Sequence, residues 1–402
     1  MRFFTSRWMV LAFAIILLFV RVQDSDYTKT LRYKTWDYFQ IESPRANLSD
    51  MVTIINITEE DLKEYGQWPW PRHIMAMLHT FISSNDAVLV NYNILFAEPD
   101  RMGGVQYLNS MPMDAETREL LEKTLLDTDK VFATLLKNSK NSVLMMSVKN
   151  KSDNVLPSTT NIIQKGNATP WIWNYAGIVP PLAMLSASAK GVGVNVTAPE
   201  PDSVVRKMPM LIRIESKLYP SMVLENIRII NQSRAIKIIT KAHGIDEVLV
   251  AKDSGIPVNH NAEMYIHYTN PDNYIHLSAG DILKGNVDKK DIEGRFIIVG
   301  LDAAGLSTLK DTPYGLMTDQ MISAQTIDTI LTGDHLIRLP QSDTYEILFM
   351  GLLGLLMIIL IPRVSVLYSI PLLVFVLGGI SYASFMAYAN KGFLIDPSFA
   401  VL

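Results

Sequence analysis

One short segment combines aromatic, proline and basic residues at a spacing suited to ligand binding. Its sequence is Trp68-Pro69-Trp70-Pro71-Arg72. Indole faces and a guanidinium group can together hold a small molecule, so Trp68, Trp70 and Arg72 are candidate ligand-binding residues. The alternative is structural: the prolines fix a rigid turn into a helix, the indoles cover the core edge and Arg72 pairs locally. We favour the structural alternative and assign the same role to Gly66, which supplies a flexible backbone position.

Acidic side chains follow two of the predicted strands. Glu98 and Asp100 come shortly after a strand predicted at residues 87–90. Asp302 comes directly after a second strand, predicted at residues 295–300. Folds with parallel sheets bind ligands at the carboxyl ends of their strands, so these acidic loops are candidates for one shared ligand site. Aspartates in such positions also cap helices, and this alternative stays open.

No residue pattern indicates catalysis, a metal site or a cofactor. The two histidines that share a strand-like region, His260 and His267, are seven residues apart, which puts them on opposite faces. The chain contains no cysteine, which excludes disulfides, cysteine-based zinc sites and a thiol nucleophile. No Ser-His-Asp arrangement, phosphate-binding loop or paired-carboxylate motif stands out. We therefore expect no catalytic residue, no metal and no cofactor.

The charge distribution argues against nucleic acid as a partner. The formal net charge is -4, and no block rich in Lys and Arg occurs anywhere in the 402 residues, so the electrostatic footprint of a nucleic-acid-binding surface is missing. Apolar residues make up 49% of the chain and charged residues only 19%. This apolar excess is unusual for a soluble protein, and it lies at the two ends of the chain.

The apolar ends predict membrane-spanning helices. Residues 3–20 approach the roughly 20 residues that a spanning helix needs, and no signal-peptidase cleavage pattern follows them. Residues 347–361 and 364–389 are two further apolar segments, separated by Pro362-Arg363, and predict a transmembrane hairpin. The last apolar segment, residues 392–402, has about half the spanning length, which we interpret as the start of a truncated fourth helix.

These segments define the expected domains. They are a cytoplasmic N-terminus with the first helix (1–23), a soluble domain (24–343), two transmembrane helices (344–361 and 364–389) and the start of a fourth (392–402). Arg2, Arg7 and Arg363 flank the apolar segments on one side, which the positive-inside rule places in the cytoplasm. The soluble domain is then outside the cytoplasm, in a multi-pass protein of the inner (plasma) membrane.

The soluble domain alternates between strand and helix patterns, which is typical of an α/β fold. Strands are predicted at 52–57, 87–90, 142–148, 262–268 and 295–300, and helices at 71–84, 116–125, 220–230 and 318–331. The first strand, helix and strand form a βαβ unit with parallel strands. The core-facing stripe of its helix is predicted to be Ile74, Met77, Leu78 and Phe81. We expect a mostly parallel or mixed sheet with flanking helices, and a polar surface loop at 149–169.

Several motifs of this domain resemble those of one family. They are Ile57-Thr58-Glu59-Glu60-Asp61-Leu62, Tyr65-Gly66-Gln67 with residues 68–72, Ile94-Leu95-Phe96-Ala97-Glu98-Pro99-Asp100, Gly191-Val192-Gly193-Val194-Asn195, Pro201-Asp202-Ser203-Val204-Val205-Arg206 and Asp311-Thr312-Pro313-Tyr314-Gly315. Their order and spacing are similar to the type-2 CHASE domain, the cyclase- and histidine-kinase-associated sensory extracellular domain of bacterial signalling proteins. The motif positions to which we assign structural roles are Gly66, Pro69, Pro71, Pro99, Asp202, Arg206, Pro313 and Gly315.

The sequence departs from the family pattern at two places. Asn93 stands where the family usually has an aspartate, and Thr318-Asp319-Gln320-Met321 replaces the usual Pro-Gly-Val-Glu/His-like helix entry. Both departures argue against a ligand role at these positions.

The resemblance implies a membrane-bound sensor that relays a stimulus from an unknown extracytoplasmic ligand, and it implies a homodimer. Family members carry a nucleotide cyclase, a histidine kinase or a Ser/Thr kinase after three transmembrane helices, and none is present in this sequence. Two alternatives stay open. One is an incomplete adenylate/guanylate cyclase or sensor kinase without its catalytic domain, and the other is a stand-alone extracytoplasmic binding or scaffold protein.

Overall fold

A computed structural model describes residues 12, 15, 16, 19–104, 108, 111–152, 157–198, 200–251, 254–360 and 363–398. The predicted first membrane segment, residues 3–20, lies largely outside these described residues. The chain divides into two compact units. The large unit comprises Asn47–Ala198 and Val205–Gly333, and the terminal unit comprises Met1–Ala46, Pro199–Val204 and Asp334–Leu402.

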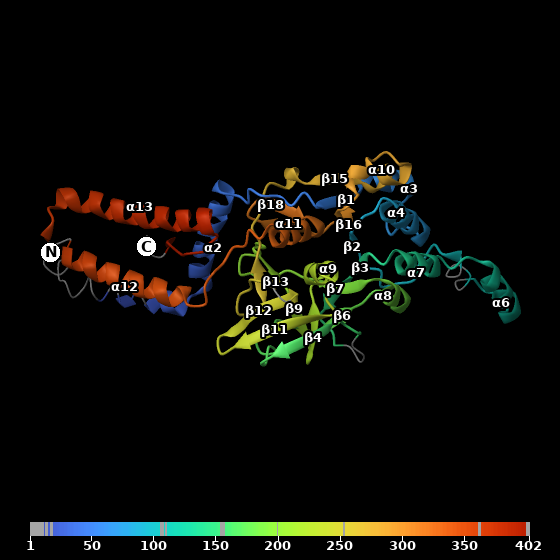
Figure 1. Ribbon diagram of the computed structural model, residues 1–402, viewed down its shortest axis with the longest axis horizontal. Helices are drawn as coiled ribbons and strands as arrows, with labels where there is room; N and C mark the ends of the chain where they lie inside the picture. Colours follow the sequence, from blue (N-terminus) through green and yellow to red (C-terminus); the bar gives the residue numbers. More distant parts are fainter. Residues whose placement is uncertain are drawn as a thin grey trace. The chain divides into compact units, whose positions relative to one another are not determined.

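The large unit is built around a mainly parallel sheet (Figure 1). Its parallel strands, in spatial order, are β15 (Ile275–Ser278), β1 (Val52–Thr58), β16 (Phe296–Asp302), β2 (Leu89–Tyr92), β3 (Ser142–Lys149) and β7 (Gly191–Asn195). β6 (Gly177–Val179) pairs with β3 in antiparallel orientation. β1 and β2 are parallel, as the βαβ pattern predicts, but β16 lies between them and pairs with both.

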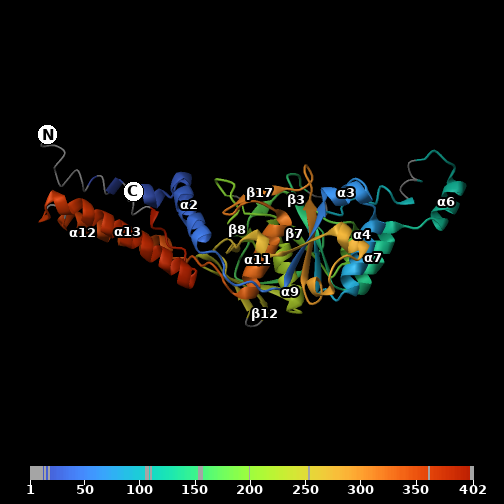
Figure 2. The same cartoon turned by 90° about the horizontal axis from the view of Figure 1, so that it is seen from above.

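Helices cover both faces of this sheet. One core contains side chains of α4 (Arg72–Ser84), α7 (Thr128–Ser139), α8 (Ala183–Ser188) and α10 (Ala279–Lys284), and Figure 2 shows α4 beside α7. The opposite core contains side chains of α9 (Met222–Ile230) and α11 (Asp319–Thr332). Alternate residues of one strand enter the two cores, as the pleat of a strand requires: Val90 joins the first and Leu89 the second.

Local sequence signals account for several helix ends. α3 (Glu59–Tyr65) begins with a capping box, in which Thr58 and Asp61 each accept a hydrogen bond from the other's backbone N–H. α11 ends at Gly333, which has the left-handed conformation that the sequence predicts.

The buried face of α4 differs from the predicted stripe. Ile74 and Leu78 are buried, but Met77 is 56% exposed and Met75 is fully buried instead. The prediction of Met77 as a core residue is therefore wrong. Both sets of residues have helical spacing, and contact with the sheet selects the face that contains Met75 and Ile82.

Further sheets make the fold a mixed α/β architecture. The predicted loop at 149–169 contains a strand, β4 (Asn161–Lys165), so that prediction is wrong for these residues. β4 pairs with β11 (Ala235–Lys241), which forms a hairpin with β12 (Gly244–Ala251), and β12 pairs with β13 (Ser254–Ile256). β11 and β12 are not among the strands predicted from the sequence.

The remaining elements of the large unit are short. They are α6 (Ala115–Thr124), β5 (Asn174–Tyr175), β8 (Lys207–Pro209), β9 (Leu211–Ile214), β10 (Lys217–Pro220), β14 (Glu263–Tyr265), η2 (Pro271–Asn273), η3 (Lys289–Asp291), β17 (Leu309–Thr312) and β18 (Gly315–Thr318). The strand predicted at 262–268 is thus reduced to β14.

The terminal unit contains α2 (Asp26–Glu42), α12 (Ser342–Leu360) and α13 (Val366–Lys391). Within the described residues, α12 and residues Leu367–Lys391 of α13 are long and apolar enough to cross a membrane. Most of their large apolar side chains are exposed, which is the arrangement expected where lipid replaces water. The segment after α13 is not helical at its start, because Phe393 forms a β-bridge with Ile337.

Candidate functional site

The candidate aromatic segment lies in the turn between α3 and α4. Trp70 is 1% exposed, and its Nε1 donates a hydrogen bond to the backbone oxygen of Gly66 at 2.9 Å. Its ring lies 5.8 Å from that of Tyr65 and 6.2 Å from that of Trp68, between centroids. Gly66 ends α3 with a φ of 99°, a conformation that residues with a Cβ rarely adopt. Trp70 and Gly66 therefore close the turn.

Arg72 is the centre of a group of polar side chains that we call the Arg72 cluster: buried Arg72, Asp100 and Asp129, and half-buried Thr128. Arg72 Nε donates to Asp129 Oδ1 at 3.0 Å, and its Nη2 donates to the backbone oxygen of Glu98 at 2.8 Å. Asp100 Oδ2 accepts from the backbone N–H of Arg72 at 2.8 Å and from Thr128 Oγ1 at 2.7 Å. Asp129 Oδ2 accepts from the backbone N–H of Asp100 at 2.8 Å.

The Arg72 cluster joins the starts of two helices to the loop after β2. α4 follows Pro71, which provides no side-chain cap, and the carboxylate of Asp100 satisfies the first N–H of the helix instead. The guanidinium carbon of Arg72 lies 4.8 Å from the ring centre of Phe96. Arg72 and Asp100 thus have partners within the large unit, which favours a structural role for both.

Five of the six candidate ligand residues line one pocket of about 330 Å³. They are Trp68, Trp70, Arg72, Glu98 and Asp100. Asp302 does not line this pocket; it ends β16 in register with Thr58 of β1. The two predicted acidic loops therefore do not share the pocket.

The accessible chemistry of the pocket differs from that of its buried wall. Glu98 and Arg101 form an exposed ion pair with 2.5 Å between Oε2 and Nη2, and Trp68 is half-buried. Pro99 lies between the two candidate acidic residues in the same lining loop. An aromatic face beside an exposed ion pair suits a small ligand that carries both an apolar part and a charged group.

The other motif residues do not line this pocket. Pro313 is in the tight turn between β17 and β18, and Gly315 follows it with a φ of 89°. Asp202 accepts a hydrogen bond from the backbone N–H of Val204 in the terminal unit. Arg206 is buried in the large unit, where its backbone oxygen accepts from the N–H of Ile266.

A family model, the CHASE2 domain, matches residues 10–359. The chain belongs to the CHASE2 family. CHASE2 domains are sensory extracellular domains, so the resemblance carried by the sequence motifs is confirmed. Comparisons with curated proteins and with solved structures give no significant match.

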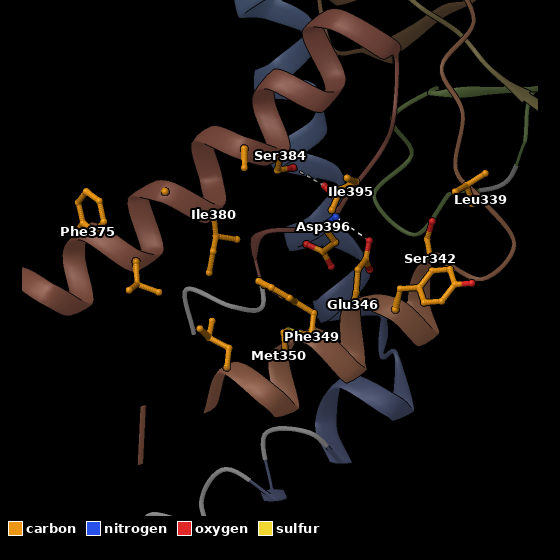
Figure 3. A pocket seen from close by; sticks show the side chains of 15 residues that line it. Leu339, Ser342, Glu346, Phe349, Met350, Phe375, Ile380, Ser384, Ile395 and Asp396 are labelled. Carbon is orange, nitrogen blue, oxygen red and sulfur yellow. Dashed lines mark hydrogen bonds between the residues drawn. The ribbon is translucent and has the colours of Figure 1, made fainter. Parts of the chain in front are cut away.

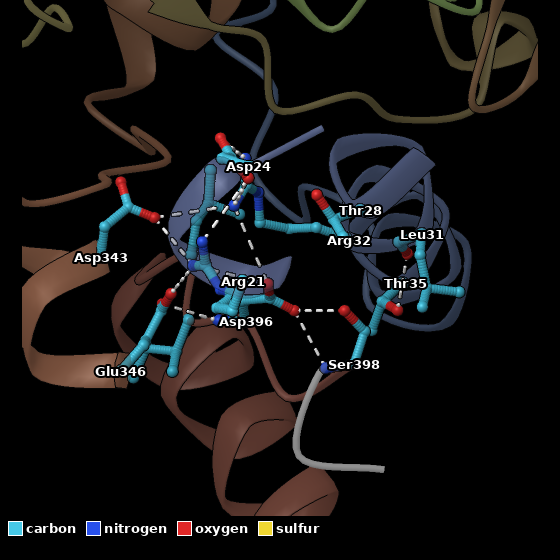
Figure 4. A network of polar contacts seen from close by, with 12 residues as sticks. Arg21, Asp24, Thr28, Leu31, Arg32, Thr35, Asp343, Glu346, Asp396 and Ser398 are labelled. Atoms are coloured by element: carbon cyan, nitrogen blue, oxygen red, sulfur yellow. Dashed lines mark hydrogen bonds and ion pairs between the residues drawn. The ribbon is translucent and has the colours of Figure 1, made fainter. Parts of the chain in front are cut away.

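The CHASE2 match extends into the terminal unit, which contains a polar network that the sequence analysis missed. Arg21 is 1% exposed, and its Nη2 donates to Asp343 Oδ1 at 2.8 Å and to Glu346 Oε2 at 2.9 Å (Figure 4). Arg338 donates to the same two carboxylates at 2.7 Å and 3.0 Å. These contacts join the start of α12 both to Arg21, near the beginning of the chain, and to Arg338, just before the helix.

The network also includes α2 and the segment after α13. Arg32 donates to both carboxylate oxygens of Asp24, at 3.1 Å and 3.2 Å. Trp36 Nε1 donates to the backbone oxygen of Ile395 at 3.1 Å, and the backbone N–H of Asp396 donates to Glu346 at 2.9 Å. We call the charged residues Arg21, Asp24, Arg32, Arg338, Asp343, Glu346 and Asp396 the terminal network. A signal was present in the sequence, since an ionisable residue inside a membrane segment, here Glu346 of α12, commonly marks a functional site.

Three asparagines of the CHASE2 domain with buried amide atoms form a second feature that was not predicted from the sequence. Asn91, Asn93 and Asn226 have side-chain nitrogen and oxygen atoms that are buried without a hydrogen-bond partner among the described residues. Asn91 lies on β2 between Ile298 of β16 and Val143 of β3. Leaving such groups unpaired costs about 1–3 kcal/mol each, so their presence is not explained by stability.

No group of three or more His, Asp or Glu side chains able to hold a metal ion occurs in the described part of the chain. His260 contacts the ring of Trp171, and His276 Nδ1 lies 3.4 Å from the Asn56 amide. The structure gives these histidines no shared site.

Proposed function

We propose that this chain is a membrane-bound sensor that takes up a stimulus with its large unit outside the cytoplasm and relays it through its terminal unit. The observation that carries the proposal is the CHASE2 match over residues 10–359 together with two exposed apolar helices, α12 and α13, at its end. A sensory extracellular domain next to spanning helices has the parts that a transmembrane relay needs.

The pocket at Trp68 is the entry point that we propose for the stimulus. Five candidate residues line this pocket, and two of them, Arg72 and Asp100, belong to the Arg72 cluster. A ligand that moved the loop around Pro99 would shift Asp100, and with it the starts of α4 and α7. A ligand changes the conformational equilibrium only by its difference in affinity for the two states, so that difference sets the size of the shift.

The terminal network is the relay that we propose. It ties α2, which precedes the large unit, to α12, which follows it. Buried charges that leave one set of partners must find another, so such a network has discrete arrangements rather than a continuum. As the family resemblance implies, we propose that the relay acts in a homodimer.

The orientation in the membrane is the part of this proposal that one experiment can decide. The chain has no cysteine, so single cysteines can be introduced and labelled. Ser152 is exposed in the large unit, and Ser365 is exposed at the start of α13. Ser152→Cys should react with a membrane-impermeant maleimide in intact cells, whereas Ser365→Cys should react only after lysis.

The two variants control each other, because each residue change is the same. Labelling of Ser365→Cys but not of Ser152→Cys in intact cells would show the opposite topology. Release of the chain from membranes by alkaline carbonate would show that it is not anchored in them. Either result contradicts the proposed function.

A further inference from the structure

A cavity of about 640 Å³ lies between α12 and α13 (Figure 3). Apolar side chains of both helices line it, among them Phe349, Met350, Phe375 and Ile380. The segment after α13 closes one end, where Ser384 Oγ donates to the backbone oxygen of Ile395 at 2.9 Å. Within the described residues this is an apolar space with one polar end.

The length of the cavity matches one leaflet of a bilayer. On α12 its lining runs from Ser342 to Leu353, a rise of about 16 Å at 1.5 Å per residue. The hydrocarbon core of a bilayer is about 30 Å thick, so one leaflet is about 15 Å. The polar end lies at the first residues of α12, where a spanning helix meets the membrane surface.

The polar end is acidic. Its charged lining residues are Glu346 and Asp396, which are 8% and 7% exposed. Glu346 is saturated, since its carboxylate accepts hydrogen bonds from Arg21, from Arg338 and from the Asp396 backbone N–H. Asp396 Oδ1 accepts from Ser398, but its Oδ2 lies 3.8 Å and 3.9 Å from the guanidinium nitrogens of Arg21 and Arg32.

The terminal network also carries an excess of negative charge. Its ion pairs join three guanidinium groups, those of Arg21, Arg32 and Arg338, to four carboxylates, a balance of 3 − 4 = −1. Each of these carboxylates has a guanidinium partner, but the Asp396 Oδ2 atom is no closer than 3.8 Å to one, so this oxygen can accept a hydrogen bond from an additional cation.

We propose that the cavity binds one membrane lipid with a primary ammonium headgroup, an aminophospholipid. One acyl chain fills the apolar space, and the ammonium donates a hydrogen bond to Asp396 Oδ2 and adds a positive charge to a network with one more carboxylate than guanidinium groups. A quaternary ammonium has no N–H to donate, and an anionic headgroup is repelled. The proposal rests on the membrane location proposed above.

The chain offers a matched pair of glycines for the test. A Cβ added at Gly378 or at Gly379 meets nothing within 4 Å, so both positions tolerate a side chain. Gly379 lines the cavity and Gly378 does not. Gly379→Phe therefore fills the space, and Gly378→Phe is the control for a bulky residue in the same helix.

The experiment is native mass spectrometry of the full chain in detergent, after exchange with phosphatidylethanolamine, phosphatidylcholine or phosphatidylglycerol. The wild-type chain should retain one phosphatidylethanolamine and bind it about tenfold more tightly than phosphatidylcholine, the ratio expected for one charge-assisted hydrogen bond. Gly379→Phe should lose the bound lipid, and Gly378→Phe should keep it. Asp396→Asn should bind the ethanolamine and choline lipids equally while still holding one acyl chain.

Three results would overturn the proposal. Equal retention of the three lipids by the wild type would show that the headgroup is not recognised. Equal behaviour of the two glycine variants would show that the lipid does not bind in the cavity. Disulfide cross-linking of Gly379→Cys to a second copy would assign the cavity to helix packing instead. Carbonate extraction of the membranes from which the chain is purified distinguishes this inference from the proposed function. A chain that stays in the membrane but retains no lipid contradicts only this inference.

Discussion

The two units bury arginine in different ways. The Arg72 cluster holds one guanidinium against the carboxylate of Asp129, while Asp100 accepts from the Arg72 backbone N–H, all within residues 72–129. The terminal network holds three guanidinium groups among four carboxylates, and its members come from both ends of the chain. A cluster with a single cation has no substitute when that cation is lost, whereas a network of three can rearrange. The first arrangement suits a fixed scaffold and the second suits a joint with more than one state.

The largest effect is expected at Arg72. Arg72→Met removes the one cation of the cluster and leaves the buried Asp129 carboxylate without its ion-pair partner, so we expect a loss of about 3–5 kcal/mol in the free energy of unfolding. Denaturant unfolding of the full chain in detergent, followed by tryptophan fluorescence, measures it. Arg101→Met is the control, because Arg101 is exposed and its ion pair with Glu98 contributes at most about 1 kcal/mol. Similar losses in both variants would contradict the scaffold role of the Arg72 cluster.

A buried neutral group in the large unit gives a second, pH-dependent effect. His79 is 1% exposed and bonded to Tyr92 Oη at 3.0 Å and to Ser139 Oγ at 2.8 Å. Burial lowers the pKa of His79 from 6.5 to about 4. The folded state therefore binds fewer protons than the unfolded state between these values, and stability present above pH 6.5 is lost as the pH falls toward 4, by about 3 kcal/mol.

The pH effect is measured from unfolding curves between pH 7 and pH 4. His79→Gln keeps hydrogen-bonding atoms but does not titrate, so its stability should change less over this range. His73→Gln on the same helix is the control, since His73 is exposed and should leave the wild-type slope intact. A wild-type slope retained in His79→Gln would assign the pH dependence to the ion-pair clusters.

The terminal network should tolerate the loss of one arginine better than the Arg72 cluster does. Arg32→Met leaves Arg21 and Arg338 beside the shared carboxylates, so we expect a loss of about 1–3 kcal/mol. Thermal unfolding of the full chain in detergent measures this change. Lys29→Met is the control on the same helix, because Lys29 is only half-buried and its partner Asp26, 3.6 Å away, is exposed. A loss as large as that of Arg72→Met would show that the network is a rigid scaffold as well.

The sequence predicts the regular elements of the large unit better than their arrangement. α11 was predicted at 318–331 and occurs at Asp319–Thr332, because Gly333 marks its end. The central position of β16 was not predictable, since a strand near the end of the domain inserts between two early strands. The hairpin of β11 and β12 was missed although Ile236 and Ile238 alternate with exposed residues as in a half-buried strand.

The candidate sites also differ in how far the sequence predicts them. The residues around Trp68 and Asp100 were predictable because they belong to motifs that are continuous in the sequence. The terminal network joins residues more than 300 positions apart, and no local pattern connects them. The same holds for Asn91 and Asn226, which look like ordinary polar positions until both are found buried.

The smallest change in stability is expected for these asparagines, which belong to neither of the two charged clusters. Asn91 is 2% exposed and lies between two apolar neighbours, Ile298 and Val143, and its amide has no partner among the described residues. Replacing an unpaired buried amide by an apolar group of similar size relieves its desolvation cost, so Asn91→Leu should leave stability unchanged or raise it by about 1 kcal/mol. Asn150→Leu, at an exposed position, controls for added apolar surface. A loss of 2 kcal/mol or more in Asn91→Leu would mean that the amide is bonded to an internal water or ligand, and the large unit would then contain a second buried polar site beside the Arg72 cluster.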